Sequence, residues 1–152
     1  MIWDDHEIMD GWGSLTETER KQKLCHWLQD DDQDNNYQLV MLMFEAASFV
    51  YYEYQHSHNP TTNIDLNNSI DCIWDYGFIQ NQFAFYMLDL RGHHDCEQAN
   101  YKLLGKAQFT RFAEWLSSEK VKQSKAIFIC SPVPVVHWNE YFVNAADFGN
   151  QK

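Results

Sequence analysis

The stretch of sequence that decides the fold lies at residues 125–134 and reads KAIFICSPVP. Its first six residues form a nearly continuous apolar run, which is typical of a strand buried on both faces. The run ends abruptly in the loop Ser131-Pro132-Val133-Pro134. Ligands of α/β proteins bind beyond the carboxyl ends of their strands, so a buried strand that ends in an irregular loop is a place for chemistry. We therefore expect an α/β fold with functional residues near this loop.

Two helices are predicted in the first part of the chain. Thr16 followed by Glu19 is a capping-box pattern, and it begins a helix at residues 16–28. The acidic and Asn-rich run at residues 30–36 reads as a solvated loop, because it lacks the Gly and Glu that a calcium loop requires. Residues 37–56 then form a long, strongly apolar stretch without Gly or Pro, which predicts a largely buried helix.

The second part of the chain predicts a strand pair and a third helix. Asn59-Pro60 stops the long helix, because the residue before a proline is pushed out of the helical region. Two β-type runs at residues 72–78 and 83–90 then read as a hairpin. A helix at residues 106–117 follows, with Phe109, Phe112, Ala113 and Leu116 on one face. With the strand at residues 125–130, the chain supplies about three strands and three helices.

Charge and composition exclude several classes of protein. The chain has 152 residues, about one domain's length, with 22 acidic and 11 basic side chains and a net charge of −11. This balance argues against a nucleic-acid footprint, whereas a small phosphate ligand stays compatible because bound metals invert the local charge. Neither a signal peptide nor a membrane span is visible, although Met1 need not be the natural start. Four well-separated cysteines read as reduced thiols and favour an intracellular protein: Cys25, Cys72, Cys96 and Cys130.

Three segments carry side chains suited to chemistry. The first is Trp3-Asp4-Asp5-His6-Glu7, whose carboxylates and imidazole suit divalent metals and proton transfer, or form an acidic turn that caps the next helix. The second ends in Arg91, which clamps a phosphate while Asp89 orients it, or forms a structural ion pair with that aspartate. The third is residues 131–138, a loop that carries His137 beside Trp138, where the histidine is a ligand or a packed or capping residue. The pair His93-His94 is a weaker candidate for a metal.

Taken in chain order, these segments resemble the PhoD-like metallophosphatases, also described as alkaline phosphatase D-like. The block at residues 3–7 and the following Asp10-Gly11-Trp12 are similar to that family's W-D-D-H-E signature, its version of the Asn-His-Glu/Asp motif of metallophosphoesterases. Further matches cover nearly the whole chain: Tyr54-Gln55, Asn59-Pro60, Leu88-Asp89-x-Arg91, Leu103-Leu104-Gly105-x-x-Gln108, Trp115-Leu116 and the loop at residues 131–134.

The resemblance implies a metal-dependent hydrolase of phosphate esters. It implies a partial metallophosphoesterase-like α/β/β/α sandwich, with Asp5 as a metal ligand and His6 as the imidazole that contacts phosphate and assists the leaving group. Arg91 and His137 would line the phosphate site. Two divalent or mixed-valence metal ions would serve as cofactors in the full-length parent, and the partner would be a phosphate-ester substrate.

The resemblance also implies that residues 1–152 are one incomplete domain. The family's first metal-ligand motifs should lie upstream of Met1, and its late Gly-Asp-x-His ligands should lie beyond Lys152. We therefore expect the segment alone to be inactive and to associate, because its apolar faces would lack their cover. The alternative is a non-catalytic interaction or scaffold module derived from the phosphatase fold.

Overall fold

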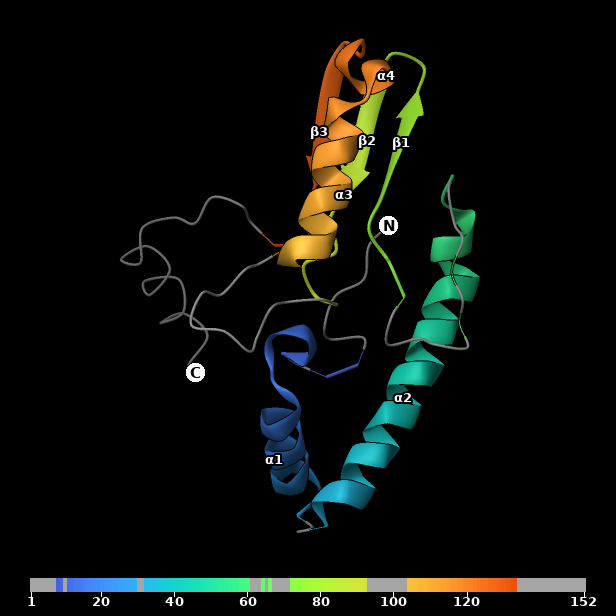
Figure 1. The fold of residues 1–152 in the computed structure, drawn as a ribbon. Helices are drawn as coiled ribbons and strands as arrows, with labels where there is room; N and C mark the ends of the chain where they lie inside the picture. Colours follow the sequence, from blue (N-terminus) through green and yellow to red (C-terminus); the bar gives the residue numbers. More distant parts are fainter. Residues whose placement is uncertain are drawn as a thin grey trace, which may run out of the picture.

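The computed structural model describes residues 8–9, 11–29, 32–60, 64, 66, 72–92 and 104–133. In these ranges, four α-helices, two short 3-10 helices and a mixed three-stranded sheet make an α/β fold, as the sequence predicts (Figure 1). In chain order they are η2 (Trp12–Ser14), α1 (Glu17–Leu28), α2 (Gln33–Tyr54), η3 (His56–His58), β1 (Tyr76–Gln80), β2 (Phe83–Met87), α3 (Gly105–Ser117), α4 (Glu119–Lys122) and β3 (Ala126–Cys130). None of the helices in the described ranges is long and apolar enough to cross a membrane.

Helix α1 begins at the predicted capping box. The Thr16 amide donates to Glu19 Oε2 at 2.8 Å, and the Glu19 amide donates to Thr16 Oγ1 at 3.3 Å. These two bonds satisfy amides that a helix start otherwise leaves without partners. Lys21 ties α1 to the next helix through an ion pair of 3.1 Å with Asp34.

Helix α2 begins earlier than predicted and is less buried than predicted. Asp32 caps it by accepting from the Asn35 amide at 3.1 Å, so most of the expected acidic loop is the first turn of the helix. Only one stripe of α2 is buried: Asn36, Val40, Phe44, Ser48 and Tyr51. The opposite side carries apolar side chains that are exposed, among them Leu42 at 61%. The expectation of a largely buried helix is wrong because, of the described helices, only α1 packs extensively along it.

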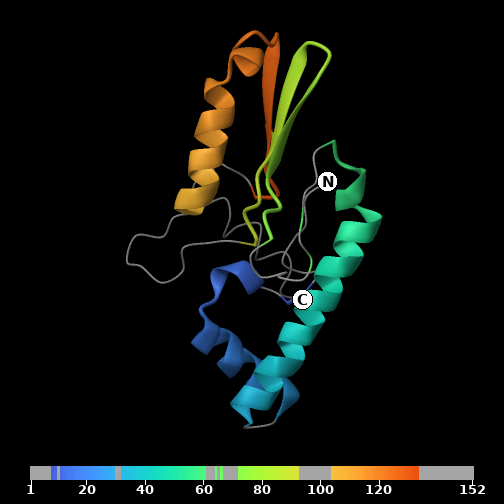
Figure 2. The ribbon, with the colours of Figure 1, turned by 45° about the vertical axis from the view of Figure 1, so that its right-hand side comes forward.

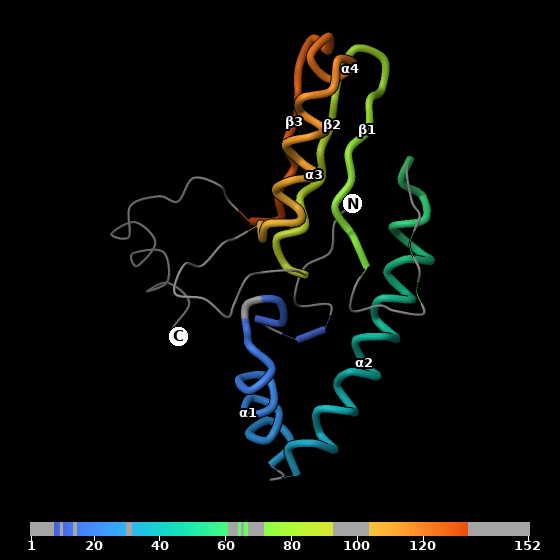
Figure 3. Tube along the Cα trace, in the orientation of Figure 1, coloured from blue at the N-terminus to red at the C-terminus, as the bar shows by residue number. Residues whose placement is uncertain are grey.

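The sheet has the order β1-β2-β3, with β1 and β2 antiparallel and β2 and β3 parallel. A two-residue turn at Asn81 and Gln82 joins the hairpin, and Asn81 adopts the left-handed conformation. The predicted hairpin is confirmed, with shorter strands. The parallel connection from β2 to β3 runs through α3 and α4, as Figure 3 follows along the chain.

Strand β3 is paired along its length but poorly covered. Its partner residues run from Phe83 with Ala126 to Met87 with Cys130. Ile129 is nevertheless 50% exposed, and the expectation of burial on both faces is wrong. Helix α3 lies on one side of the sheet (Figure 2). Its side chains Phe112 and Trp115 contact Tyr86 of β2, and Trp115 lies against Gly77 of β1, whereas β3 is an outer strand of the sheet.

Two apolar clusters hold the described elements together. The first joins α1, α2 and the approach to β1: Met9, Trp12, Leu24, Val40, Phe44, Tyr51, Cys72 and Trp74. The second joins the end of β2 to α3: Tyr86, Leu88 and Leu90, with Leu104, Phe112, Trp115 and Val133 packed against them. Helix α3 approaches β1 closely, since a Cβ atom on Gly77 would lie 2.4 Å from the Trp115 indole nitrogen. A glycine is needed at that contact.

Candidate functional site at the carboxyl edge of the sheet

The two parallel strands end side by side, and the loops that follow them begin at the same edge of the sheet. Strand β2 ends at Met87 and β3 at Cys130, which are register partners. The Leu88 amide donates to the Cys130 carbonyl at 2.9 Å, one residue beyond the pairing. Val133 packs on the cluster that contains Leu88. The second predicted segment, residues 88–91, and the described part of the third, residues 131–133, therefore lie together at the edge where α/β proteins bind ligands.

Asp89 organises the backbone that leads to Arg91. Its side chain is buried, and Oδ1 accepts from the Arg91 amide at 3.1 Å and from the Gly92 amide at 2.8 Å. A carboxylate that gathers two amides of the following residues makes a tight turn in which the backbone has little freedom. The aspartate thus sets where the backbone of Arg91 lies.

Gln108 on α3 forms two hydrogen bonds with the backbone of the same aspartate. Gln108 Oε1 accepts from the Asp89 amide at 2.9 Å, and Gln108 Nε2 donates to the Asp89 carbonyl at 2.6 Å. Both residues are almost fully buried, with exposed fractions of 1% for Asp89 and 3% for Gln108. The sequence analysis quoted Gln108 within one of the family matches and gave it no role, because a lone glutamine on a helix otherwise reads as a solvated position.

The segment that follows the acidic signature lies directly against Arg91. A Cβ atom on Gly13 would lie 1.7 Å from the Arg91 carbonyl oxygen, so only a glycine permits this backbone approach. The neighbouring Trp12 is held from the other side by Arg20, whose Nη1 donates to the Trp12 carbonyl at 3.3 Å and whose guanidinium lies 4.9 Å from the indole centroid. Residues 12–13, which follow the first predicted segment, therefore meet the second predicted segment in the fold.

Among the predicted site residues, Arg91 lies in the described part of the chain, and it is half-buried at this edge. Asp5, His6 and His137 lie outside the described residues, as do His93 and His94. The structure brings together the described neighbours of all three predicted segments: residues 12–13, 88–92 and 131–133.

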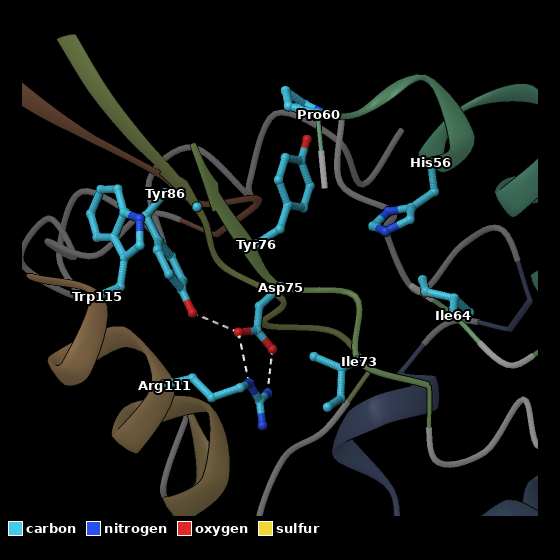
Figure 4. A pocket seen from close by; sticks show the side chains of 10 residues that line it. His56, Pro60, Ile64, Ile73, Asp75, Tyr76, Tyr86, Arg111 and Trp115 are labelled. Atoms are coloured by element: carbon cyan, nitrogen blue, oxygen red, sulfur yellow. Dashed lines mark hydrogen bonds and ion pairs between the residues drawn. The ribbon is translucent and has the colours of Figure 1, made fainter. Parts of the chain in front are cut away.

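A second polar cluster lies near the start of β1, and sequence reasoning missed it. Asp75 accepts from the Tyr86 hydroxyl at 2.6 Å and from Arg111 Nε at 3.1 Å, and Arg111 Nη2 forms an ion pair with its other oxygen (Figure 4). The hydrogen bond to Asp75 raises the pKa of Arg111, and burial raises the pKa of Tyr86 far above its usual value. These residues border a pocket of about 660 Å³.

The Asp75 cluster reads as a structural link between β1 and α3. The Arg111 guanidinium neutralises the carboxylate, which also accepts from the Tyr86 phenol, so the cluster joins the start of β1 to β2 and α3. The sequence contains an indication that these charges are buried and paired, because Asp75 stands between two aromatic residues and Arg111 stands beside Phe112 on a helix. Pairing them needed the fold, since they are 36 residues apart.

A metal site does not form within the described residues, which contain no group of three or more His, Cys, Asp or Glu side chains that could hold an ion. The Asp89 oxygen Oδ1 serves two backbone amides instead. The residues predicted to bind a metal, Asp5 and the weaker pair His93-His94, lie outside the described part.

Comparisons with known proteins yield no relative. No protein-family model, no curated protein and no solved structure matches the chain. A functional assignment therefore depends on the chain's own residues and their arrangement.

Proposed function

We propose that this chain is the central part of a PhoD-like, metal-dependent hydrolase of phosphate esters. One observation supports the proposal most. The described neighbours of the three segments with predicted chemistry meet at the carboxyl edge of β2 and β3, with the Gly13 backbone against Arg91. Segments so far apart in sequence have no local reason to meet, and this edge is where α/β folds bind ligands.

Arg91 is the phosphate-binding residue in this proposal. A guanidinium presents two parallel N–H donors to an oxyanion. The buried Asp89 carboxylate accepts from the Arg91 and Gly92 amides and so fixes the backbone from which the Arg91 side chain extends. His6 would donate a proton to the leaving oxygen, Asp5 would bind a metal, and His137 would line the same site. A two-metal site supplies a hydroxide near neutral pH and stabilises the charge of the transferring phosphoryl group.

The experiment that tests the proposal uses the complete gene product that contains this chain. We expect it to hydrolyse an aryl phosphate ester, and we expect a chelator to abolish the turnover. Changing His6→Ala should lower turnover by ~10²-fold with metal content nearly intact, as general acid–base groups typically contribute that much. His26→Ala is the matched control, because His26 is exposed on α1.

The possible results separate the roles. Unchanged turnover in His6→Ala would remove His6 from the mechanism. A wild-type protein with no chelator-sensitive turnover would overturn the proposed function as a whole.

One observation favours the rival class, a non-catalytic interaction module. The three strands contain no charged residue, and stacked Phe78, Phe85 and Phe128 cross the sheet with centroid distances of 5.0 Å at both steps. Natural sheets usually protect an edge with a charged side chain, and apolar surfaces of this kind often bind proteins. The chelator experiment distinguishes the two classes, because an interaction module would show no turnover.

A further inference from the structure

We propose that Gln108 is the positioning residue for Arg91, and that it acts through the backbone of Asp89. The inference deepens the proposed function and rests on it, because the guanidinium that is positioned is the one assigned to phosphate. The resemblance assigned no role to Gln108, and the structure places it 19 residues along the chain from the loop that it contacts.

The side-chain amide of Gln108 continues the hydrogen bonding of β2 beyond the end of its pairing. The β1–β2 pairing ends at Met87, two residues before Asp89. Gln108 then offers one acceptor and one donor to the amide and carbonyl of Asp89, at 2.9 and 2.6 Å. A neighbouring strand offers the same two groups. Gln108 therefore substitutes for a strand at the point where the chain turns toward Arg91.

The burial of Gln108 shows that these bonds must be made. Placing a primary amide in apolar surroundings is costly unless its hydrogen bonds are satisfied. The amide donates to the Leu104 carbonyl as well, at 3.4 Å, so the first turn of α3 also fixes its position. An apolar residue of the same length would fill the space and leave the Asp89 backbone without these bonds.

The constraint passes from helix α3 to Arg91 in two steps. Gln108 fixes the Asp89 backbone, and the Asp89 carboxylate then fixes the Arg91 and Gly92 amides. Helix α3 is itself held on the sheet by the Asp75–Arg111 ion pair. Hydrogen bonds therefore attach the turn that carries Arg91 to a helix that is itself packed on the sheet. A binding group needs such a rigid support to be positioned precisely.

Gln108→Glu is the informative variant, because a protonated carboxylic acid reproduces the amide and an ionised one does not. The acid form accepts from the Asp89 amide and donates to the Asp89 carbonyl, whereas the carboxylate has no donor and lies close to a second carboxylate. Burial at this position and the nearby Asp89 carboxylate raise the pKa of the introduced carboxyl, so it is protonated near pH 5. We therefore expect kcat/KM of the variant near pH 5 to be within about threefold of the wild-type value. Near pH 8 it should be ~10²-fold below the wild-type value, a loss typical of a misplaced binding group.

The measurement uses the complete gene product and an aryl phosphate ester, with the ratio to wild type taken at each pH. Gln123→Glu, at an exposed position after α4, controls for the added carboxylate. Amide hydrogen exchange of Arg91 and Gly92, compared with wild type at the same pH, gives a readout that needs no turnover. Near pH 8 the exchange should be faster than in wild type in Gln108→Glu and equal to wild type in Gln123→Glu. A role in stability alone would lower the melting temperature without this pH-dependent change in kcat/KM.

Failure of the inference differs from failure of the proposed function. A wild-type protein without turnover overturns the function, and the inference falls with it. A wild-type protein with turnover, beside a pH-independent ratio in Gln108→Glu, overturns the inference alone. If Gln108→Glu does not fold near pH 8, Gln108→Met decides instead: a loss of at least about tenfold in kcat/KM at every pH supports positioning, and wild-type kcat/KM contradicts it.

Discussion

His56 makes the stability of the fold depend on pH. Its imidazole is buried at the end of α2, with the rings of Trp74 and Tyr76 at centroid distances of 5.1 and 5.4 Å. Asn59 Nδ2 lies 3.3 Å from His56 Nδ1. Burial lowers the pKa of His56 from 6.5 to about 4, because the cationic form loses its hydration among these rings.

Unfolding restores the ordinary pKa, so the unfolded chain binds a proton that the folded chain does not between about pH 6.5 and pH 4. The stabilisation is therefore fully present above pH 6.5 and is lost as the pH falls through this window. At about 1.4 kcal/mol for each tenfold change in the proton equilibrium, the difference amounts to about 3 kcal/mol by pH 4.

Urea denaturation of the wild type and of His56→Phe, near pH 7 and near pH 4.5, measures this effect. Phenylalanine keeps a ring among Trp74 and Tyr76 and has no proton to bind, and His58→Phe serves as the control because His58 is exposed. We expect the free energy of unfolding to fall by about 2–3 kcal/mol more in the wild type than in His56→Phe. Equal losses in the two proteins would refute a buried neutral imidazole at this position.

Three further predictions follow from the described contacts. Arg111→Met should lower the free energy of unfolding in urea by about 3 kcal/mol, at the low end for a broken buried ion pair because Arg111 is 34% exposed; a loss below about 1 kcal/mol would contradict the link between α3 and β1. Gly13→Ala should lower the melting temperature and the phosphatase kcat/KM together, since its Cβ would lie 1.7 Å from the Arg91 carbonyl, and a wild-type kcat/KM would contradict the contact. The 152-residue chain alone should bind metal weakly, show no phosphatase activity and associate in light scattering, and Phe128→Lys on the uncovered sheet face should reduce the association; a monomer with chelator-sensitive turnover would contradict this expectation.

Local patterns predicted the elements of this fold well. The capping box of Thr16 and Glu19 acts within one turn, so its sequence signature fixes the start of α1 without any knowledge of the rest. The start of α2 was misplaced because Asp32 caps a helix as readily as it occupies a loop.

Burial was harder to predict than secondary structure. An apolar pattern shows that Leu42 and Ile129 would be suited to a core, whereas their exposure depends on which elements are present to cover them. Helix α3 contacts β1 and β2 through Phe112 and Trp115, whereas Phe128 and Ile129 of β3 are 46% and 50% exposed. The sequence pattern of β3 therefore shows that the strand is suited to burial on both faces, whereas the structure shows that its side chains are partly exposed.

The polar contacts at the site were beyond sequence reasoning for a different reason. The residues at 88–91 were singled out because they lie at the end of a predicted strand, and the structure places them at the carboxyl edge of β2. Gln108 binds the backbone amide and carbonyl of Asp89. Because almost every residue has these two backbone groups, the amino-acid type at the contacted position does not indicate such a bond. Interactions of this kind become visible only when the path of the chain is known.

The central claim is that the carboxyl edge of β2 and β3 binds the phosphate of an ester through Arg91. The most direct test compares wild type, Arg91→Ala and Arg20→Ala in the complete gene product, measuring kcat/KM for an aryl phosphate ester with and without chelator. Arg20 is the matched control, because it contacts the same Trp12–Gly13 segment from the side of α1. The account predicts chelator-sensitive turnover that falls by ~10²-fold or more in Arg91→Ala and changes by less than about tenfold in Arg20→Ala. Chelator-sensitive turnover that Arg91→Ala leaves at the wild-type level would contradict it.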